Sequence, residues 1–353
     1  MMATMQLSPN QSRAGHRTVR RGGVAVRINA HVLLLTGIAL VALLLLFIWA
    51  MTLGSYSIPF QDVVKSVFGH GTDDQILVVR ELRLPRVLTA AMVGACLAVS
   101  GAIFQGLVRN PLVSPDIIGV NAGAVVVAVF WIVSGLSYRL MPLAAFLGAS
   151  AAAAVVYLLT WKKGISPNRM ILVGIGVGEF LYAFNQYLLV KFPLEKVRPA
   201  IVWSIGSIYG SNWFDVKVLA ATLLICLPVT VVLAWPLRAM QLGDDVVRGL
   251  GLPLERTRLG LIVAACALAG VAVSLAGPIG FVALMVPHFA RMLVGPLSGS
   301  MILFTAVIGA IFVLGVDTIG QHFMPVALPV GALTAAFGAP YFLFLLYRSN
   351  TRM

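Results

Sequence analysis

Few residues of this chain could carry out covalent chemistry, and they are scattered along it. The sequence contains no Gly-x-x-x-x-Gly-Lys-Ser/Thr phosphate loop, so it lacks the usual means of binding ATP. It contains no His-Glu-x-x-His motif and no closely spaced cysteine pair, and its five histidines are isolated from one another. Cys96, Cys226 and Cys266 lie far apart in apolar stretches, which indicates buried structural residues. We therefore expect no catalytic residues, no bound cofactor and no metal site.

Clustered arginines suggest recognition of a partner instead. Arg80, Arg83 and Arg86 precede a long apolar run, and an arginine can form a bidentate pair with a carboxylate. The alternative is that these side chains extend to lipid headgroups.

A second polar segment, residues 241–256, is predicted to form a short helix. Asp244 and Asp245 would lie in its first turn, where the helix dipole favours acidic residues, and glycines would end it. Its apolar face would consist of Leu242, Val246, Val247 and Leu250. A solvated connector does not need such a face, whereas a contact with a cytoplasmic protein does.

Membrane-spanning helices must position these residues. Of the 353 residues, 60% are hydrophobic and 10% charged, whereas a soluble domain has roughly 25% charged residues. These values exclude a soluble enzyme and a disordered chain. The net charge of +13 would suggest nucleic acid for a soluble protein, but here it indicates membrane orientation, and we expect no nucleic-acid partner.

Ten apolar runs are candidate spans. They are 32–53, 87–107, 117–136, 141–161, 169–190, 217–236, 258–276, 279–294, 299–316 and 329–347. Residues 199–213 are expected to form a half-helix or re-entrant piece. Residues 57–69, between the first two spans, have the spacing of an amphipathic helix on the membrane.

The predicted organisation is a basic arm over residues 1–30, a ten-span domain over 31–348 with a long loop near 238–257, and a tail over 349–353. Sixteen of the 25 Lys and Arg fall on the side of the arm. The positive-inside rule therefore places both termini in the cytoplasm. Glu179 is the one ionisable residue near the middle of a span, and it is expected either to line a pathway or to form an interior hydrogen bond.

The order of several motifs resembles a known family. They are Arg83-Leu84-Pro85-Arg86, Ser100 to Gln105, Arg109-Asn110-Pro111-Leu112, Pro115-Asp116, Leu242-Gly243-Asp244, Ala276 to Phe281, Pro287-His288 and Leu328-Pro329-Val330-Gly331. Over about residues 35–348 the chain is similar to the FecCD family of permease subunits in type II ATP-binding-cassette (ABC) importers, and most similar to the G-type subunits of ferric enterobactin permeases.

The resemblance implies an all-α integral membrane protein with a BtuC-like bundle in the bacterial plasma (inner) membrane. It also implies a partner for each face: a second permease subunit, two copies of an ATPase below and a substrate-binding protein above. Such a subunit is not itself an enzyme, because ATP and Mg²⁺ are used by the ATPase. The cargo would be a ferric siderophore, moved by alternating access.

The resemblance also assigns roles to residues. Arg80, Arg83, Arg86 and Gln321 would dock the binding protein, and Glu179 and Asn185 would lie near the translocation path. The ATPase would be contacted by Leu242, Gly243, Asp244, Asp245, Val246, Val247, Leu250 and Gly251. The signature from Gly277 to His288 would fix helix packing.

One departure from the family pattern favours a heterodimer over a homodimer. Many relatives carry Arg at the position of Gln321 and Glu at that of Ala327, and a different partner subunit could supply them. Two alternatives stay open for the function. An importer of haem or cobalamin would share these motifs, whereas an ion-coupled secondary transporter would need more buried carboxylates than Glu179.

Overall fold

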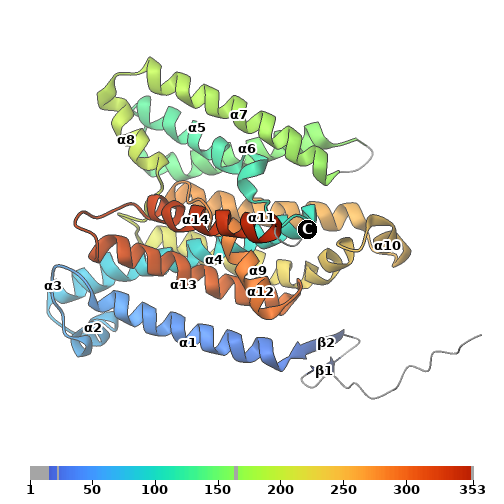
Figure 1. The fold of residues 1–353 in the computed structure, drawn as a ribbon. Helices are drawn as coiled ribbons and strands as arrows, with labels where there is room; N and C mark the ends of the chain where they lie inside the picture. Colours follow the sequence, from blue (N-terminus) through green and yellow to red (C-terminus); the bar gives the residue numbers. More distant parts are fainter. Residues whose placement is uncertain (1–15, 22–23, 163–165, 351–353) are drawn as a thin grey trace, which may run out of the picture.

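The computed structural model describes residues 16–21, 24–162 and 166–350, and nearly all of this chain is helical (Figure 1). Ten helices match the ten predicted spans. They are α1 (Ala30–Thr52), α4 (Leu84–Val108), α5 (Val120–Val133), α6 (Met141–Thr160), α7 (Pro167–Lys191), α9 (Trp213–Met240), α11 (Leu254–Ala276), α12 (Val282–Val294), α13 (Gly299–His322) and α14 (Val330–Asn350). Seven helical segments are long and apolar enough to cross a membrane, and the apolar parts of α5, α12 and α14 are shorter.

Shorter elements connect these helices. They are α2 (Phe60–Val67), α3 (Asp73–Ile76), the π-helix η1 (Leu77–Arg83), the 3-10 turns η2 (Pro115–Ile118) and η3 (Tyr138–Leu140), α8 (Leu194–Ser204) and α10 (Asp244–Gly249). In the predicted basic arm, β1 (His16–Arg21) and β2 (Val24–Asn29) pair as an antiparallel hairpin. Residues 1–15 of the arm, with Arg13, and residues 351–353 of the tail lie outside the described residues.

The predicted amphipathic helix is present as α2, which starts after Pro59. Val63 is buried against the bundle, whereas Phe60, Val64 and Phe68 are exposed. The half-helix predicted over residues 199–213 corresponds to α8, which starts five residues earlier and ends at Ser204, and an irregular segment follows it. Two other predicted boundaries were also wrong. The helical chain already begins at Asp73, ahead of α4, and residues 317–322, predicted to be a turn, continue α13 to its end.

The centre of the bundle is α4, which is buried along most of its length. It packs against α9, α11, α12 and α13. Small residues allow these helices to approach closely, and such contacts drive helix association in a membrane, where the hydrophobic effect contributes little. Gly94 faces the backbone of Gly309 in α13, and Gly101 faces that of Ala283 in α12, so a side chain at either glycine would overlap a carbonyl group.

The irregular segment after α8 is held by the ends of two helices. The amide of Ser207 donates to the carbonyl of Ala276 at 2.7 Å, and the amide of Gly331 donates to that of Gly206 at 3.1 Å. These bonds join the segment that follows α8 to the last residue of α11 and to the first turn of α14. Non-helical backbone at membrane depth needs such internal partners, because lipid offers none.

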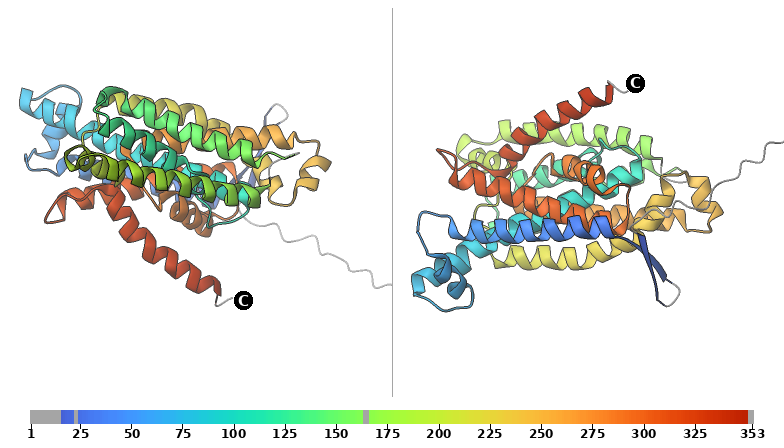
Figure 2. Two further views of the ribbon diagram at one scale, coloured as in Figure 1. Left: turned by 90° about the horizontal axis from the view of Figure 1, so that it is seen from above. Right: turned by 60° about the horizontal axis from the view of Figure 1, so that its bottom comes forward.

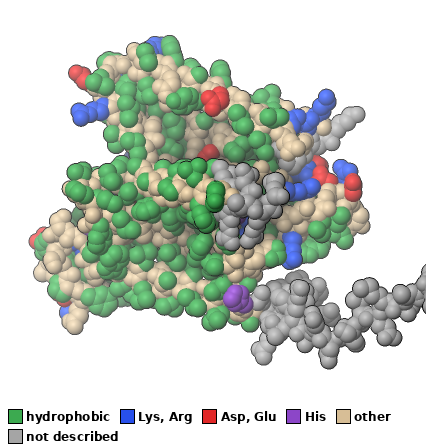
Figure 3. Space-filling model, viewed as in Figure 1, with side chains coloured by type: hydrophobic (Ala, Val, Ile, Leu, Met, Phe, Trp, Pro, Cys, Tyr) green, Lys and Arg blue, Asp and Glu red, His purple; other side chains and the backbone are tan. Residues whose placement is uncertain are grey.

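The two ends of the bundle are polar and the band between them is apolar. On the face in Figure 3, Lys, Arg, Asp and Glu gather mainly at the ends, while hydrophobic side chains cover most of the middle. In Figure 1, α14 begins near the end opposite the hairpin and runs toward the hairpin's end of the bundle. Figure 2 shows α14 leaving the bundle toward its C-terminus, and α14 packs only against α12 and α13 among the described elements with substantial contacts.

The contact between α4 and α13 yields a stability prediction. Gly94→Ala should lower the free energy of unfolding by about 1–3 kcal/mol, because the added methyl group must displace the α13 backbone. The control is Gly37→Ala in α1, where no atom lies within 4 Å of the added Cβ. Thermal unfolding of both variants in detergent checks the prediction, which is contradicted if the two midpoints shift equally.

Candidate functional site

At the N-terminal end of α4, Arg86 forms an ion pair within the chain. Its Nε atom lies 3.0 Å from Asp317 Oδ2 and its Nη2 atom lies 2.9 Å from Asp317 Oδ1. The two side chains are 16% and 6% exposed. The Arg86 charge is therefore already balanced, and the pair ties α4 to α13. It also lets α13 continue as a helix through a carboxylate that the sequence suggested lay in a turn.

Arg83 is engaged with backbone carbonyls. Its Nη1 atom donates to the carbonyl of Met51 at 3.0 Å, and its Nη2 atom donates to that of Tyr56 at 2.5 Å. These bonds hold the end of α1 and the following loop against the start of α4. Arg80 is exposed, and its carbonyl accepts a hydrogen bond from the Trp213 indole at 3.1 Å.

A cavity of about 750 Å³ gathers most of the predicted docking residues at this end. Arg83, Arg86 and Gln321 line it, together with Tyr209 and Ala327, whereas Arg80 does not. The Arg86 guanidinium lies 5.8 Å from the centre of the Tyr209 ring, which is within the range of a cation–π contact. The structure thus brings into one groove residues that are more than 200 positions apart in the chain.

At the opposite end, the predicted loop helix is α10, and Asp244 is held by two arginines. Arg109 Nη2 lies 2.6 Å from Asp244 Oδ1, and Arg258 Nη2 lies 3.1 Å from Asp244 Oδ2. Arg258 also pairs with Glu255 at 3.2 Å. Gly243 precedes α10 with φ 126° and Gly251 follows it with φ 72°, backbone conformations that favour glycine.

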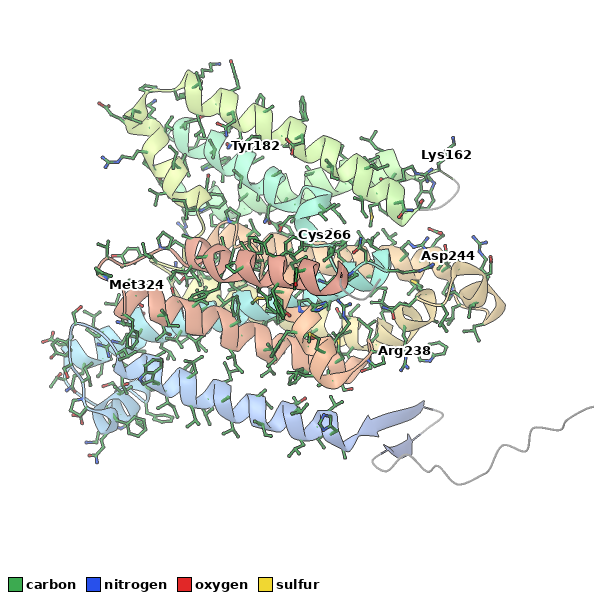
Figure 4. The ribbon with its side chains drawn as sticks, in the orientation of Figure 1. Lys162, Tyr182, Arg238, Asp244, Cys266 and Met324 are labelled. Atoms are coloured by element: carbon green, nitrogen blue, oxygen red, sulfur yellow. The ribbon has the colours of Figure 1, made fainter. Side chains whose placement is uncertain are left out.

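The apolar residues of α10 divide between two sides. Val247 is fully buried against the bundle, while Leu242, Val246 and Leu250 are 75%, 42% and 55% exposed. Asp245 is fully exposed and lies 3.6 Å from Arg248. In Figure 4, Asp244 lies at the same end of the bundle as Lys162 and Arg238, and Met324 lies at the other. The loop therefore presents an exposed apolar stripe on one side, while Asp244 and Val247 attach its other side to the bundle.

The two residues predicted to lie near the path are separated. Glu179 is exposed on α7, between the exposed Ile175 and Tyr182 on the same face. Asn185 is 8% exposed, and its Oδ1 atom accepts no hydrogen bond within the described part of the chain. An ionisable group on an apolar face in mid-span is costly unless a protein surface or a water-filled path covers it.

The signature from Gly277 to His288 packs against α4. Gln105 Nε2 donates to the carbonyls of Ala283 and Leu284 at 3.4 and 2.9 Å, and Arg291 donates to Gln105 Oε1.

Asp116 lies in the loop between α4 and α5, where burial raises the pKa of its carboxyl to about 6, although a hydrogen bond from Ser114 opposes this shift. Among the described residues no group of His, Cys, Asp and Glu could hold a metal ion.

Sequence reasoning missed the ion partners. Asp317, Arg109, Arg258 and Glu255 received no role, yet they decide how the predicted residues are held. One signal was available: charged residues are rare in this chain, and those at the ends of spans need partners.

Comparisons with known proteins agree with this arrangement. Residues 32–348 match the model of the FecCD transport family. A probable siderophore transport system permease protein of Bacillus subtilis is 43% identical, over 94% of this chain and 99% of its own. The ferric enterobactin transport system permease protein of Escherichia coli is 38% identical, over 86% and 93%. A solved inward-facing conformation of a putative metal-chelate type ABC transporter superposes with a TM-score of 0.81 at 31% identity, covering 89% and 99%.

The Arg86–Asp317 pair yields a second stability prediction. Arg86→Ala should lower the free energy of unfolding by about 3–5 kcal/mol, because it leaves the Asp317 carboxylate buried without a counter-charge. Combining it with Asp317→Ala should restore part of that loss, since neither charge then remains. Thermal unfolding of the single and double variants makes the comparison. A double variant less stable than Arg86→Ala would contradict the prediction.

Proposed function

Because the chain belongs to the FecCD transport family, we propose that it is the permease subunit of an ABC importer that carries a ferric siderophore inward. It is a multi-pass protein of the bacterial plasma membrane. The observation that carries the proposal is α10, whose exposed stripe of Leu242, Val246 and Leu250 lies on an anchored loop at one end of the bundle.

The exposed apolar stripe on α10 could form the contact with an ATPase subunit whose movement the permease must follow. The chain has no phosphate loop, so ATP and Mg²⁺ would bind to that separate subunit, of which an importer would hold two copies. Closure of the ATPases on ATP would displace α10, and the bundle would shift between outward-open and inward-open states. The chain itself would form no covalent intermediate and would not be an enzyme.

The groove at the opposite end suits a substrate-binding protein. Arg83 and Arg86 line it, and Arg80 stands exposed beside it, so an acidic side chain entering the groove would meet several guanidinium groups. Because Asp317 already neutralises Arg86, the incoming carboxylate would share that arginine with Asp317. Gln321 would offer a hydrogen bond in place of a charge.

A second permease subunit would cover the face that holds Glu179. Lipid would leave this carboxylate unpaired in mid-span, whereas a partner subunit could enclose it beside a translocation path, with Asn185 further along α7. The absence of a charge at Gln321 and Ala327 favours a heterodimer, in which the other subunit supplies it.

The siderophore assignment follows the named relatives, which transport siderophores or ferric enterobactin. The test is uptake of iron-55 ferric siderophore into proteoliposomes that contain the chain, a second permease, the ATPase and the binding protein. We expect uptake that requires ATP and the binding protein. Uptake driven by an ion gradient without ATP would refute the importer, and full activity with this chain as the sole permease would refute the heterodimer.

The exposed stripe yields a matched mutational test. Val246→Asp should reduce co-purification of the ATPase with the permease at least tenfold, because it places a charge in the centre of an apolar contact. The control is Val64→Asp in α2, since Val64 is 41% exposed against 42% for Val246 but lies on the opposite end. Equal ATPase recovery from both variants would count against α10 as the contact.

A further inference from the structure

Asp244 connects two helices that are remote from each other in the chain. Arg109 ends α4 and Arg258 lies in the first turns of α11, and both contact the Asp244 carboxylate. Arg258 is only 4% exposed, so this contact lies on the bundle side of α10. We propose that Asp244 is a positioning residue that joins α10 to α4 and α11 together, so that displacement of α10 moves the central helix of the bundle.

The backbone of Arg109 is left-handed, and this residue caps the C-terminus of α4. Arg109 adopts φ 58°, one of two left-handed residues other than glycine in the described chain, and α4 ends there. A cation at the C-terminus of a helix is also favoured by the helix dipole. The Arg109 side chain, which leaves this end of α4, lies 2.6 Å from the Asp244 carboxylate.

The charges of the junction balance. Arg109 and Arg258 face the carboxylates of Asp244 and Glu255, so two positive charges meet two negative charges. Replacing Asp244 by asparagine keeps the shape of the side chain but leaves two guanidinium groups with one carboxylate. The contact between α10 and α4 would then lose its charge pair, while Arg258 would keep its pair with Glu255.

Asp245, the neighbouring aspartate, makes no such contact with α4 or α11 in the part of the chain that the structure describes. Asp245 is fully exposed, and the 3.6 Å contact with Arg248 stays within α10. The apolar stripe also faces away from the bundle, so α10 has one side for attachment and another for a partner. Asp244 belongs to the attached side, and this role differs from the direct ATPase contact expected from the family resemblance.

The inference rests on the proposed function, and its first test measures coupling. In proteoliposomes, Asp244→Asn should keep the ATPase bound and basal ATP hydrolysis within about twofold of the wild type, while transport per ATP hydrolysed falls about tenfold. The control is Asp62→Asn in α2, which removes a similar contact within a helix, to Lys65 at 3.3 Å, at the opposite end of the bundle, and it should change neither quantity. Unchanged coupling in Asp244→Asn, or an equal loss in Asp62→Asn, would overturn the proposal.

Three further variants exclude a general folding defect. Arg109→Gln should reduce coupling as Asp244→Asn does, and the double variant should be no worse than either, because both changes remove the same contact. Asp244→Glu should recover part of the coupling, since it keeps the charge. Additive losses in the double variant would overturn the assignment.

A second measurement needs no partner subunit, so it separates this inference from the proposed function. Spin labels at Arg248→Cys on α10 and Lys162→Cys after α6, in a chain whose three native cysteines are replaced, report where α10 lies. The distance distribution should be narrow in the parent and with Asp245→Asn, and broad with Asp244→Asn. A narrow distribution with Asp244→Asn would overturn the proposal even if the chain proved to bind no ATPase.

Discussion

The arrangement of this protein depends on how closely other helices approach α4. Along most of its length α4 is surrounded by protein. Gly94 and Gly101 have no side chains, so the neighbouring helices contact the α4 backbone directly at these two positions. In lipid the packing of small residues replaces the hydrophobic effect as the force between helices. Because α9, α11, α12 and α13 all pack on this one helix, its position determines theirs, and any motion of the bundle must keep or exchange these contacts.

Among the described residues, the ion pairs of that central helix lie at its two ends. At one end Arg86 meets Asp317 from α13, and at the other Arg109 meets Asp244 from α10. The first pair is largely buried, with Arg86 reaching the groove, and both arginines of the second junction are held by carboxylates within the chain. The surfaces open to partners therefore lie beside these pairs: the groove next to Arg86, and the apolar stripe of α10.

The sequence was sufficient to predict ten helices, since each overlaps one of the ten apolar runs and the short eighth run is the short helix α12. Within the described chain, seven helical segments are long and apolar enough to cross a membrane. The spacing of apolar residues was also sufficient for α2. The sequence-based prediction placed the start of the second span too late, because arginines lower the local hydropathy there. Pro85 does not prevent a helix at this point, since proline is well tolerated in the first turn of α4. The prediction did not pair Arg86 with Asp317, because 231 residues separate them and only the folded bundle brings them together. The apolar set on α10 was predicted as one face, but tertiary packing turns Val247 inward.

The divergence of α14 and the exposed Glu179 have a cellular consequence. Without the second permease subunit proposed above as its companion, a newly inserted chain would present a carboxylate and a last helix with few contacts to the bilayer. Cells remove such species continuously through membrane proteases and chaperones, so small differences in stability become large differences in abundance. The level of this protein in the membrane would then follow the supply of its companion, and surplus copies would be degraded.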